Sequence, residues 1–194
     1  MSFSERLSEL LCEDGINSNE DREIVQFGLE SIKGNLTGVF LTLLVGIVVG
    51  DLLGAVFFYV LFFPIRKSVG GFHAKTQIRC LFMSAGILAI AFILFYKLTI
   101  PVIFSWMSFV TSACLIFVLA PVDNPTKPFD NIEFQVYRKR SRIILMFESI
   151  LYVFAVCLSW DTIIRSINIV FFVSCISLIM GKIKNAVTSK TMQM

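Results

Sequence analysis

The chain has 194 residues, of which 56% are hydrophobic and only 16% are charged, and its formal net charge is +3. This small number of charged side chains cannot cover the surface of a water-soluble globule of this size. The composition therefore argues against an ordinary soluble enzyme. We expect an integral membrane protein that lies in a lipid bilayer and binds no nucleic acid, with its long apolar runs forming transmembrane helices.

Residues 1–34 form a polar N-terminal segment with eight acidic and three basic side chains. This composition is the opposite of a basic, apolar secretory signal, so we expect no cleaved leader. Apolar residues recur at helical spacing on both sides of a polar linker at residues 15–19. The pattern predicts two short amphipathic helices that lie on the membrane surface or dock on the helical bundle.

Six apolar runs follow within residues 35–181, and the first two are separated by a break. As one helix, residues 36–65 would be ~45 Å long, well beyond the ~30 Å hydrocarbon core of a bilayer. Gly50, Asp51 and Gly54 supply a turn in this stretch. We therefore predict an all-α polytopic membrane protein with about six transmembrane helices in three hairpins. The predicted spans are residues 35–49, 52–65, 78–96, 102–120, 143–159 and 162–180.

Basic residues are concentrated in alternate connections between these spans. They gather in the loop 66–80, the loop 121–142 and the tail 182–194, whereas only Lys97 and Arg165 lie on the other side. Because cytoplasmic segments are enriched in Lys and Arg, we expect both loops and both termini to be cytoplasmic.

Ionisable and thiol side chains inside the apolar runs need their own interpretation. Glu148 lies within the fifth predicted span, where an acid can act in catalysis. We favour instead that it pairs with a basic neighbour such as Arg142 or faces a polar seam. The five cysteines form no CxxC pair, so we predict no disulfide framework. One histidine, no HExxH and no acidic cluster predict neither a metal site nor a cofactor.

The loop 66–80 combines residue types that suit nucleophilic catalysis. It contains the single histidine, His73, and Cys80, and a thiolate attacks a carbonyl well when an adjacent imidazole exchanges protons with it. On a straight helix the two residues would lie ~10 Å apart along the axis, so the chain between them must bend. Gly70 and Gly71 give it that freedom. From the residue types alone, two interpretations stay open: a catalytic dyad, or a histidine that makes an interfacial contact and an unrelated cysteine that packs at a helix start.

A helix is predicted to begin just after Thr76, which is an acceptable N-cap residue. Cys80 then lies in or just after the first turn of that helix. The helix dipole and the neighbouring Arg79 favour a thiolate there.

Two stretches of the chain carry a family resemblance. The first consists of Arg66, the run Gly70-Gly71-Phe72-His73-Ala74 and Cys80; the second is residues 120–128, Ala-Pro-Val-Asp-Asn-Pro-Thr-Lys-Pro. Together they resemble the hallmarks of the AgrB (accessory gene regulator B) family, and the resemblance extends over nearly the whole chain. Members of this family are membrane cysteine endopeptidases of Gram-positive bacteria that convert an AgrD-like quorum-sensing propeptide into a cyclic peptide.

The resemblance implies a thiol protease in the bacterial cell membrane, with His73 and Cys80 as the catalytic pair and Arg66, Gly70 and Gly71 as supporting positions. Cys80 would form an acyl-enzyme as the C-terminal tail of the propeptide leaves, and an internal nucleophile would then close a (thio)lactone autoinducing peptide. The resemblance also suggests a homodimer. A peptide exporter or transporter without proteolytic activity is the alternative.

The loop 121–142 holds two further candidate groups. Asp123 and Asn124 are suited to orient His73, although Asp-Asn-Pro is also a turn-forming sequence. A basic run is suited to bind an acidic peptide tail or anionic lipid headgroups, and membrane topology alone also explains it. The run consists of Arg138, Lys139, Arg140 and Arg142.

Overall fold

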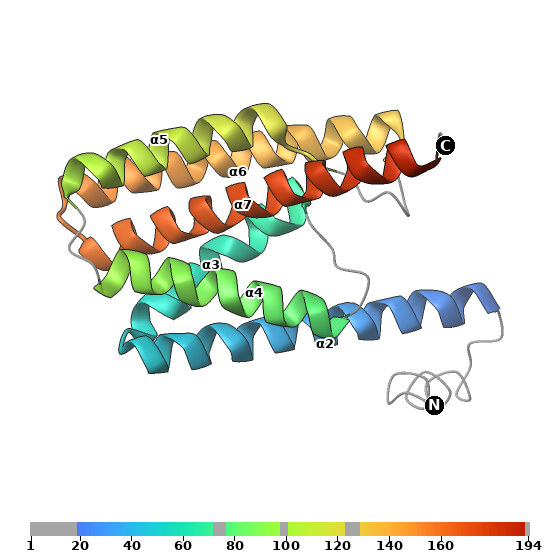
Figure 1. The fold of residues 1–194 in the computed structure, drawn as a ribbon, viewed down its shortest axis with the longest axis horizontal. Helices are drawn as coiled ribbons and strands as arrows, with labels where there is room; N and C mark the ends of the chain where they lie inside the picture. The colour runs from blue at the N-terminus through green and yellow to red at the C-terminus, as the bar shows by residue number, and fades with distance from the viewer. Residues whose placement is uncertain (1–18, 72–76, 98–100, 123–128, 193–194) are drawn as a thin grey trace. The chain divides into compact units, whose positions relative to one another are not determined.

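The computed structural model describes residues 19–71, 77–97, 101–122 and 129–192. These residues form six α-helices, and no strand ladder occurs among them. A π-helical turn, Ile93–Lys97, continues α4. The helices, labelled as in Figure 1, are α2 (Asn19–Val49), α3 (Leu52–Val69), α4 (Gln77–Phe92), α5 (Val102–Leu119), α6 (Asn131–Cys157) and α7 (Asp161–Met192).

Each predicted apolar span coincides with all or part of one helix, so the all-helical class is confirmed. Within the described part of the chain, four stretches are long and apolar enough to cross a membrane, which supports a membrane location. They are Ile32–Val49, Leu52–Val69, Val102–Leu119 and Asp161–Val187. The apolar stretch Phe82–Tyr96 is shorter, and α6 begins with polar and basic residues. The arrangement of six spans in three hairpins therefore stays a prediction.

Three helices extend far beyond the predicted spans, and α3 extends beyond its span by four residues, to Val69. The α2 helix runs without interruption from Asn19 to Val49, so the predicted second N-terminal helix and the first span are one helix. The α6 helix begins at Asn131, inside the predicted loop 121–142, and α7 continues to Met192 through most of the predicted tail. Hydropathy indicates which part of a helix can lie in the hydrocarbon core of a bilayer. It does not indicate where the helix itself begins or ends.

The early start of α6 has a local cause. The Asp130 carboxylate accepts a hydrogen bond from the Asn131 N–H at 2.7 Å, and the Asp130 N–H donates to Glu133 Oε2 at 3.2 Å. This capping box satisfies N–H groups that the first turn of a helix leaves without partners.

The predicted break between the first two spans is confirmed. The α2 helix ends at Val49, and Gly50 has φ +86°, a backbone conformation that favours glycine. Asp51 then caps α3, because its carboxylate accepts a hydrogen bond from the Gly54 N–H at 2.7 Å.

The chain divides into two compact units, residues 1–41 and 42–194. The described part of the first unit is the N-terminal portion of α2, in which Ile32, Leu36 and Phe40 form an exposed apolar stripe at helical spacing. The second unit contains the end of α2 and the other five helices.

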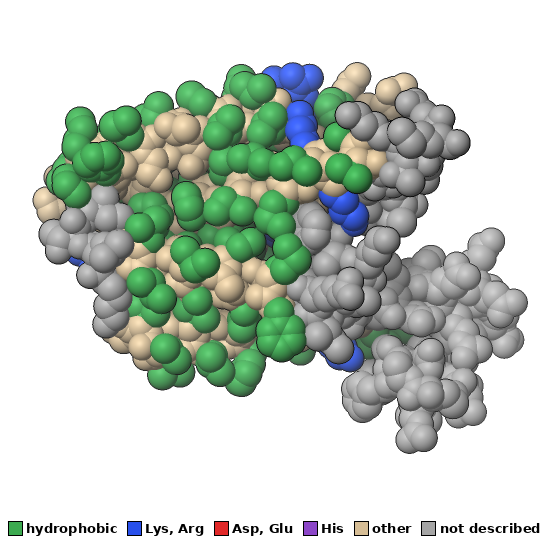
Figure 2. Space-filling view, in the orientation of Figure 1, with side chains coloured by type: hydrophobic (Ala, Val, Ile, Leu, Met, Phe, Trp, Pro, Cys, Tyr) green, Lys and Arg blue, Asp and Glu red, His purple; other side chains and the backbone are tan. Residues whose placement is uncertain are grey.

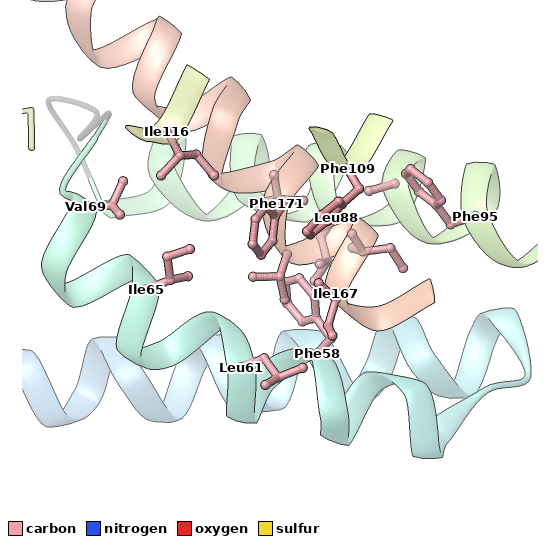
Figure 3. Packing of buried hydrophobic residues seen from close by; sticks show 14 of the residues in the cluster. Phe58, Leu61, Ile65, Val69, Leu88, Phe95, Phe109, Ile116, Ile167 and Phe171 are labelled. Carbon is pink, nitrogen blue, oxygen red and sulfur yellow. The ribbon is translucent and has the colours of Figure 1, made fainter. Parts of the chain in front are cut away.

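The core of the second unit is built around α7, which contacts α3, α4, α5 and α6. Residues 166–171 of α7 are all buried, as expected of a helix that is covered on every side. Figure 3 shows Ile65 of α3, Phe109 and Ile116 of α5 and Phe171 of α7 within one apolar cluster. The bundle is therefore held together by apolar packing across α7.

The outer surface of the second unit is apolar as well. Figure 2 shows hydrophobic side chains spread over α5 to α7, with Lys and Arg side chains gathered toward one end. Phe104, Val118 and Phe147 are among the large apolar side chains that are exposed there. Water-soluble monomers rarely expose apolar surface on this scale, whereas a bilayer requires it.

Candidate functional site

The α3 and α7 helices run parallel and touch near both ends of α3. Near its start, the Ser166 hydroxyl donates to the Gly54 carbonyl oxygen at 3.1 Å. Near its end, Arg66 Nη1 donates to the Ser177 hydroxyl oxygen at 2.6 Å. The point at which the loop 66–80 leaves α3 is therefore held against α7.

Two glycines end α3. The Gly70 N–H closes the last turn on the Arg66 carbonyl oxygen at 3.3 Å, and the Gly70 carbonyl oxygen accepts from Arg66 Nη1 at 2.6 Å. The φ angles of Gly70 and Gly71 are +74° and +126°, in the left-handed half of backbone space where a side chain is strained. The helical conformation therefore ends at these two glycines, and Arg66 stabilises this end of α3. The bend predicted between His73 and Cys80 involves residues outside those described, so it stays a prediction.

Gly70 also forms the one β-bridge found among the described residues, and its partner is Val122. The Val122 N–H donates to the Val69 carbonyl oxygen at 3.0 Å, and Val122 itself is buried. A Cβ atom on Gly70 would run into the Val122 carbonyl oxygen. The bridge brings the segment after α5 against the first residues of the loop 66–80.

The structure brings Arg66, Gly70 and Gly71 together as one cluster. His73 lies outside the described residues, as do Asp123 and Asn124, which directly follow Val122 in the chain. The backbone of Cys80 belongs to the first turns of α4, which begins at Gln77 as predicted; its side chain is not among those described. The approach of His73 to Cys80 therefore stays a prediction.

The basic run lies on α6 and is exposed. Arg138, Lys139 and Arg142 line a shallow pocket of about 310 Å³ together with Gln135, Ile143 and Met146. The Arg142 guanidinium lies 4.5 Å from the centre of the Phe117 ring of α5. Arg140 is exposed but does not line the pocket. Three of the four predicted tail-binding cations thus share one groove.

Of the two alternatives left open for Glu148, the pairing with Arg142 is wrong. Glu148 is 1% exposed, and neither of its carboxylate oxygens has a hydrogen-bond partner among the described residues. Six residues along an α-helix turn the side chain to a different face, so Arg142 is exposed against Phe117 while Glu148 points into the bundle.

A polar network one turn from Glu148 was not predicted. The Tyr152 and Ser105 hydroxyls lie 3.3 Å apart, and Asn168 Nδ2 donates to both, at 3.4 and 2.9 Å. An asparagine inside the apolar run of α7 was the available signal. Ser177, which accepts from Arg66, was also missed, because a serine in an apolar helix is indistinguishable by type from a small packing residue.

The described residues of the candidate site offer hydrogen-bonding groups and cationic side chains. Among them, no group of three or more His, Cys, Asp or Glu side chains lies close enough to hold a metal ion. Cys114, Cys157 and Cys175 are free thiols, of which the first two are exposed.

One known family matches the chain. A family model described as AgrB, accessory gene regulator B, matches residues 4–183, which include both long loops. No curated protein and no solved structure matches the chain significantly. The family match agrees with the resemblance carried by the motifs at residues 66–80 and 120–128.

Proposed function

The chain belongs to the AgrB family, and from this premise we propose that it is a membrane-embedded cysteine endopeptidase. Membership implies a part in processing an AgrD-type propeptide for quorum sensing, and association with the membrane. In our proposal the enzyme removes the C-terminal tail of the propeptide and promotes closure of the rest into a thiolactone or lactone autoinducing peptide. The family match, together with the motif at residues 66–80, carries the proposal.

The proposed reaction has two acyl transfers. The Cys80 thiolate attacks a carbonyl on the substrate, the C–N bond to the tail breaks as His73 protonates the leaving amine, and a thioester on Cys80 remains. An internal Cys or Ser of the peptide then attacks the thioester, closes the ring and releases the Cys80 thiol. The start of α4 at Gln77 supports this role, because backbone N–H groups at a helix N-terminus favour a thiolate in the first turns.

Ring closure must compete with hydrolysis of the thioester. We propose that the site lies in a membrane-embedded cleft at the end of the apolar bundle, which excludes water and holds the internal nucleophile at a high effective concentration. An enclosed apolar setting therefore favours cyclisation over hydrolysis.

The anchored start of the loop 66–80 supports the proposed roles of Arg66, Gly70 and Gly71 in orienting the chain toward His73. Asp123 and Asn124 follow Val122, whose backbone is bonded to Val69, so we propose them as the residues that orient His73. The alternative role for both is to form the Asp-Asn-Pro turn.

The pocket on α6 supports a role in binding the substrate tail. Arg138, Lys139 and Arg142 present three cations beside the apolar Ile143 and Met146, and an acidic peptide complements this surface. Arg140 would act with them as a long-range charge. Anionic lipid headgroups are the competing ligand.

We further propose a multi-pass protein with both termini and both long loops in the cytoplasm, and a homodimer as its assembly. The Val69–Val122 and Arg66–Ser177 contacts support the topology, because they gather the starts of the basic segments at one end of the bundle.

Peptide export without proteolysis is the second candidate. The buried Glu148 favours it, since an ionisable residue inside a membrane bundle often marks a substrate or ion pathway. Export predicts a transport signal that survives substitution of the proposed catalytic pair.

The direct test mixes purified protein in lipid vesicles with an AgrD-like propeptide and follows tail release by mass spectrometry. We expect Cys80→Ala to abolish release, because no nucleophile remains, and His73→Ala to lower the rate by about 10²- to 10⁴-fold, because the leaving amine loses its proton donor. Cys114→Ala, which removes an exposed thiol of α5, should cleave like the wild type. Cleavage retained by Cys80→Ala would exclude the cysteine mechanism.

A further inference from the structure

Arg66 and Ser177 join two segments that are 111 residues apart in the chain. Arg66 lies in the last turn of α3, and Ser177 lies near the middle of α7. The Arg66 Nη1 atom donates both to the Ser177 hydroxyl oxygen and to the Gly70 carbonyl oxygen, each at 2.6 Å. One nitrogen therefore connects the first residue after α3 to α7.

Gly71 lies directly against this contact. A Cβ atom added to Gly71 would come within 2.6 Å of both Arg66 Nη1 and Ser177 Oγ, so the backbone passes the pair with no spare room. His73 is the second residue after Gly71. The direction in which the chain leaves the Arg66–Ser177 contact therefore sets where the segment carrying the histidine begins.

We propose that Ser177 is a positioning residue for the protease reaction and acts through Arg66. Its hydroxyl oxygen holds the guanidinium, which holds the Gly70 carbonyl and so the start of the loop. A displacement of about 1 Å at a catalytic group costs about 10²-fold in rate, so a loosened loop start slows the chemistry. This inference rests on the proposed function, because it assigns Ser177 to the same reaction.

The chain offers a matched control on the same helix. Ser174 lies one turn before Ser177 and is buried, and its hydroxyl has no hydrogen-bond partner among the described residues. Ser174→Ala and Ser177→Ala each remove one hydroxyl from α7, but only the second removes an acceptor for Arg66.

The test measures steady-state cleavage of an AgrD-like propeptide by the full chain in lipid vesicles. We expect Ser177→Ala to lower kcat by about 10- to 100-fold while KM stays within about twofold, because the geometry of the reaction changes and the groups that bind substrate do not. Ser174→Ala should match the wild type. Adding Ser177→Ala to Arg66→Ala should cause no further loss, because Ser177 acts only through Arg66.

Three results would overturn the positioning role and leave the protease mechanism intact. They are a kcat for Ser177→Ala equal to that of Ser174→Ala, an additive loss in the double variant, and a loss that only follows the folded fraction measured by thermal unfolding. Cleavage retained by Cys80→Ala would instead remove the proposed function, and this inference with it.

Discussion

Gly71 is restricted to glycine by two independent constraints. Its φ angle of +126° is strained for any residue with a side chain, and a Cβ atom there would press on Arg66 Nη1 and Ser177 Oγ. We expect Gly71→Ala to lower kcat for propeptide cleavage at least tenfold, because the added methyl group violates both constraints and displaces the start of the loop that carries His73. It should also destabilise the fold by about 1–3 kcal/mol. Steady-state kinetics and thermal unfolding in detergent measure the two effects.

Gly86 provides the control for this substitution. It lies in α4, and a Cβ atom there would meet nothing within 4 Å. Gly86→Ala should therefore leave kcat unchanged and stabilise the helix by up to about 1 kcal/mol. Equal effects of the two substitutions would show that Gly71 is not a special position.

The residues of the site were predictable to different degrees. Residue type and motif indicated Arg66, Gly70 and Gly71, and the structure brings these three together. Ser177 could not be found in this way, because its role arises from a contact across 111 residues, which no local pattern encodes. The pairing of Glu148 with Arg142, one of the two alternatives, fails for a different reason: proximity in sequence does not give the direction of each side chain around the helix axis.

At the scale of the elements, the capping box explains why α6 begins inside a segment that composition marked as a loop. Asp130→Ala removes the side-chain acceptor and should destabilise the protein by about 1 kcal/mol. For a chain of this size we expect the Tm to fall by about 2–4 °C, measured by thermal unfolding in detergent. Glu133→Gln keeps an acceptor at the third helical position and should change the Tm less. A Tm of Asp130→Ala equal to that of the wild type would contradict the cap.

The positions of the helices were therefore easier to predict than their ends. Apolar runs longer than a soluble helix requires located all six helices, and Gly50 and Asp51 located the first turn. The start of α6 and the end of α7 are polar and basic, and composition alone does not separate a polar helix from a polar loop. The sequence Asp-Asn-Ile-Glu at residues 130–133 was the local signal for the start of α6.

At the scale of the whole molecule, the second unit has two distinct ends. At one end, Val69 is bonded to Val122 and Arg66 is bonded to Ser177. At the other, the Tyr96 hydroxyl donates to the Thr162 carbonyl oxygen at 3.3 Å. The basic segments adjoin the first end, and for this reason we propose that this end faces the cytoplasm.

The proposed orientation of the two ends across the membrane predicts which positions a membrane-impermeant thiol reagent reaches. In a variant whose five native cysteines are replaced by serine, Asp161→Cys, at the start of α7, should be labelled in intact cells. Lys139→Cys, near the start of α6, should be labelled only after the membrane is permeabilised, because α6 carries the chain from one end of the bundle to the other. Labelling of both positions from the same side would mean that α6 does not cross the membrane. The α6 helix begins with polar and basic residues and, like α4, is not among the four stretches that are long and apolar enough to span a membrane. This pair of positions therefore tests one of the two least supported spans of the six-span topology.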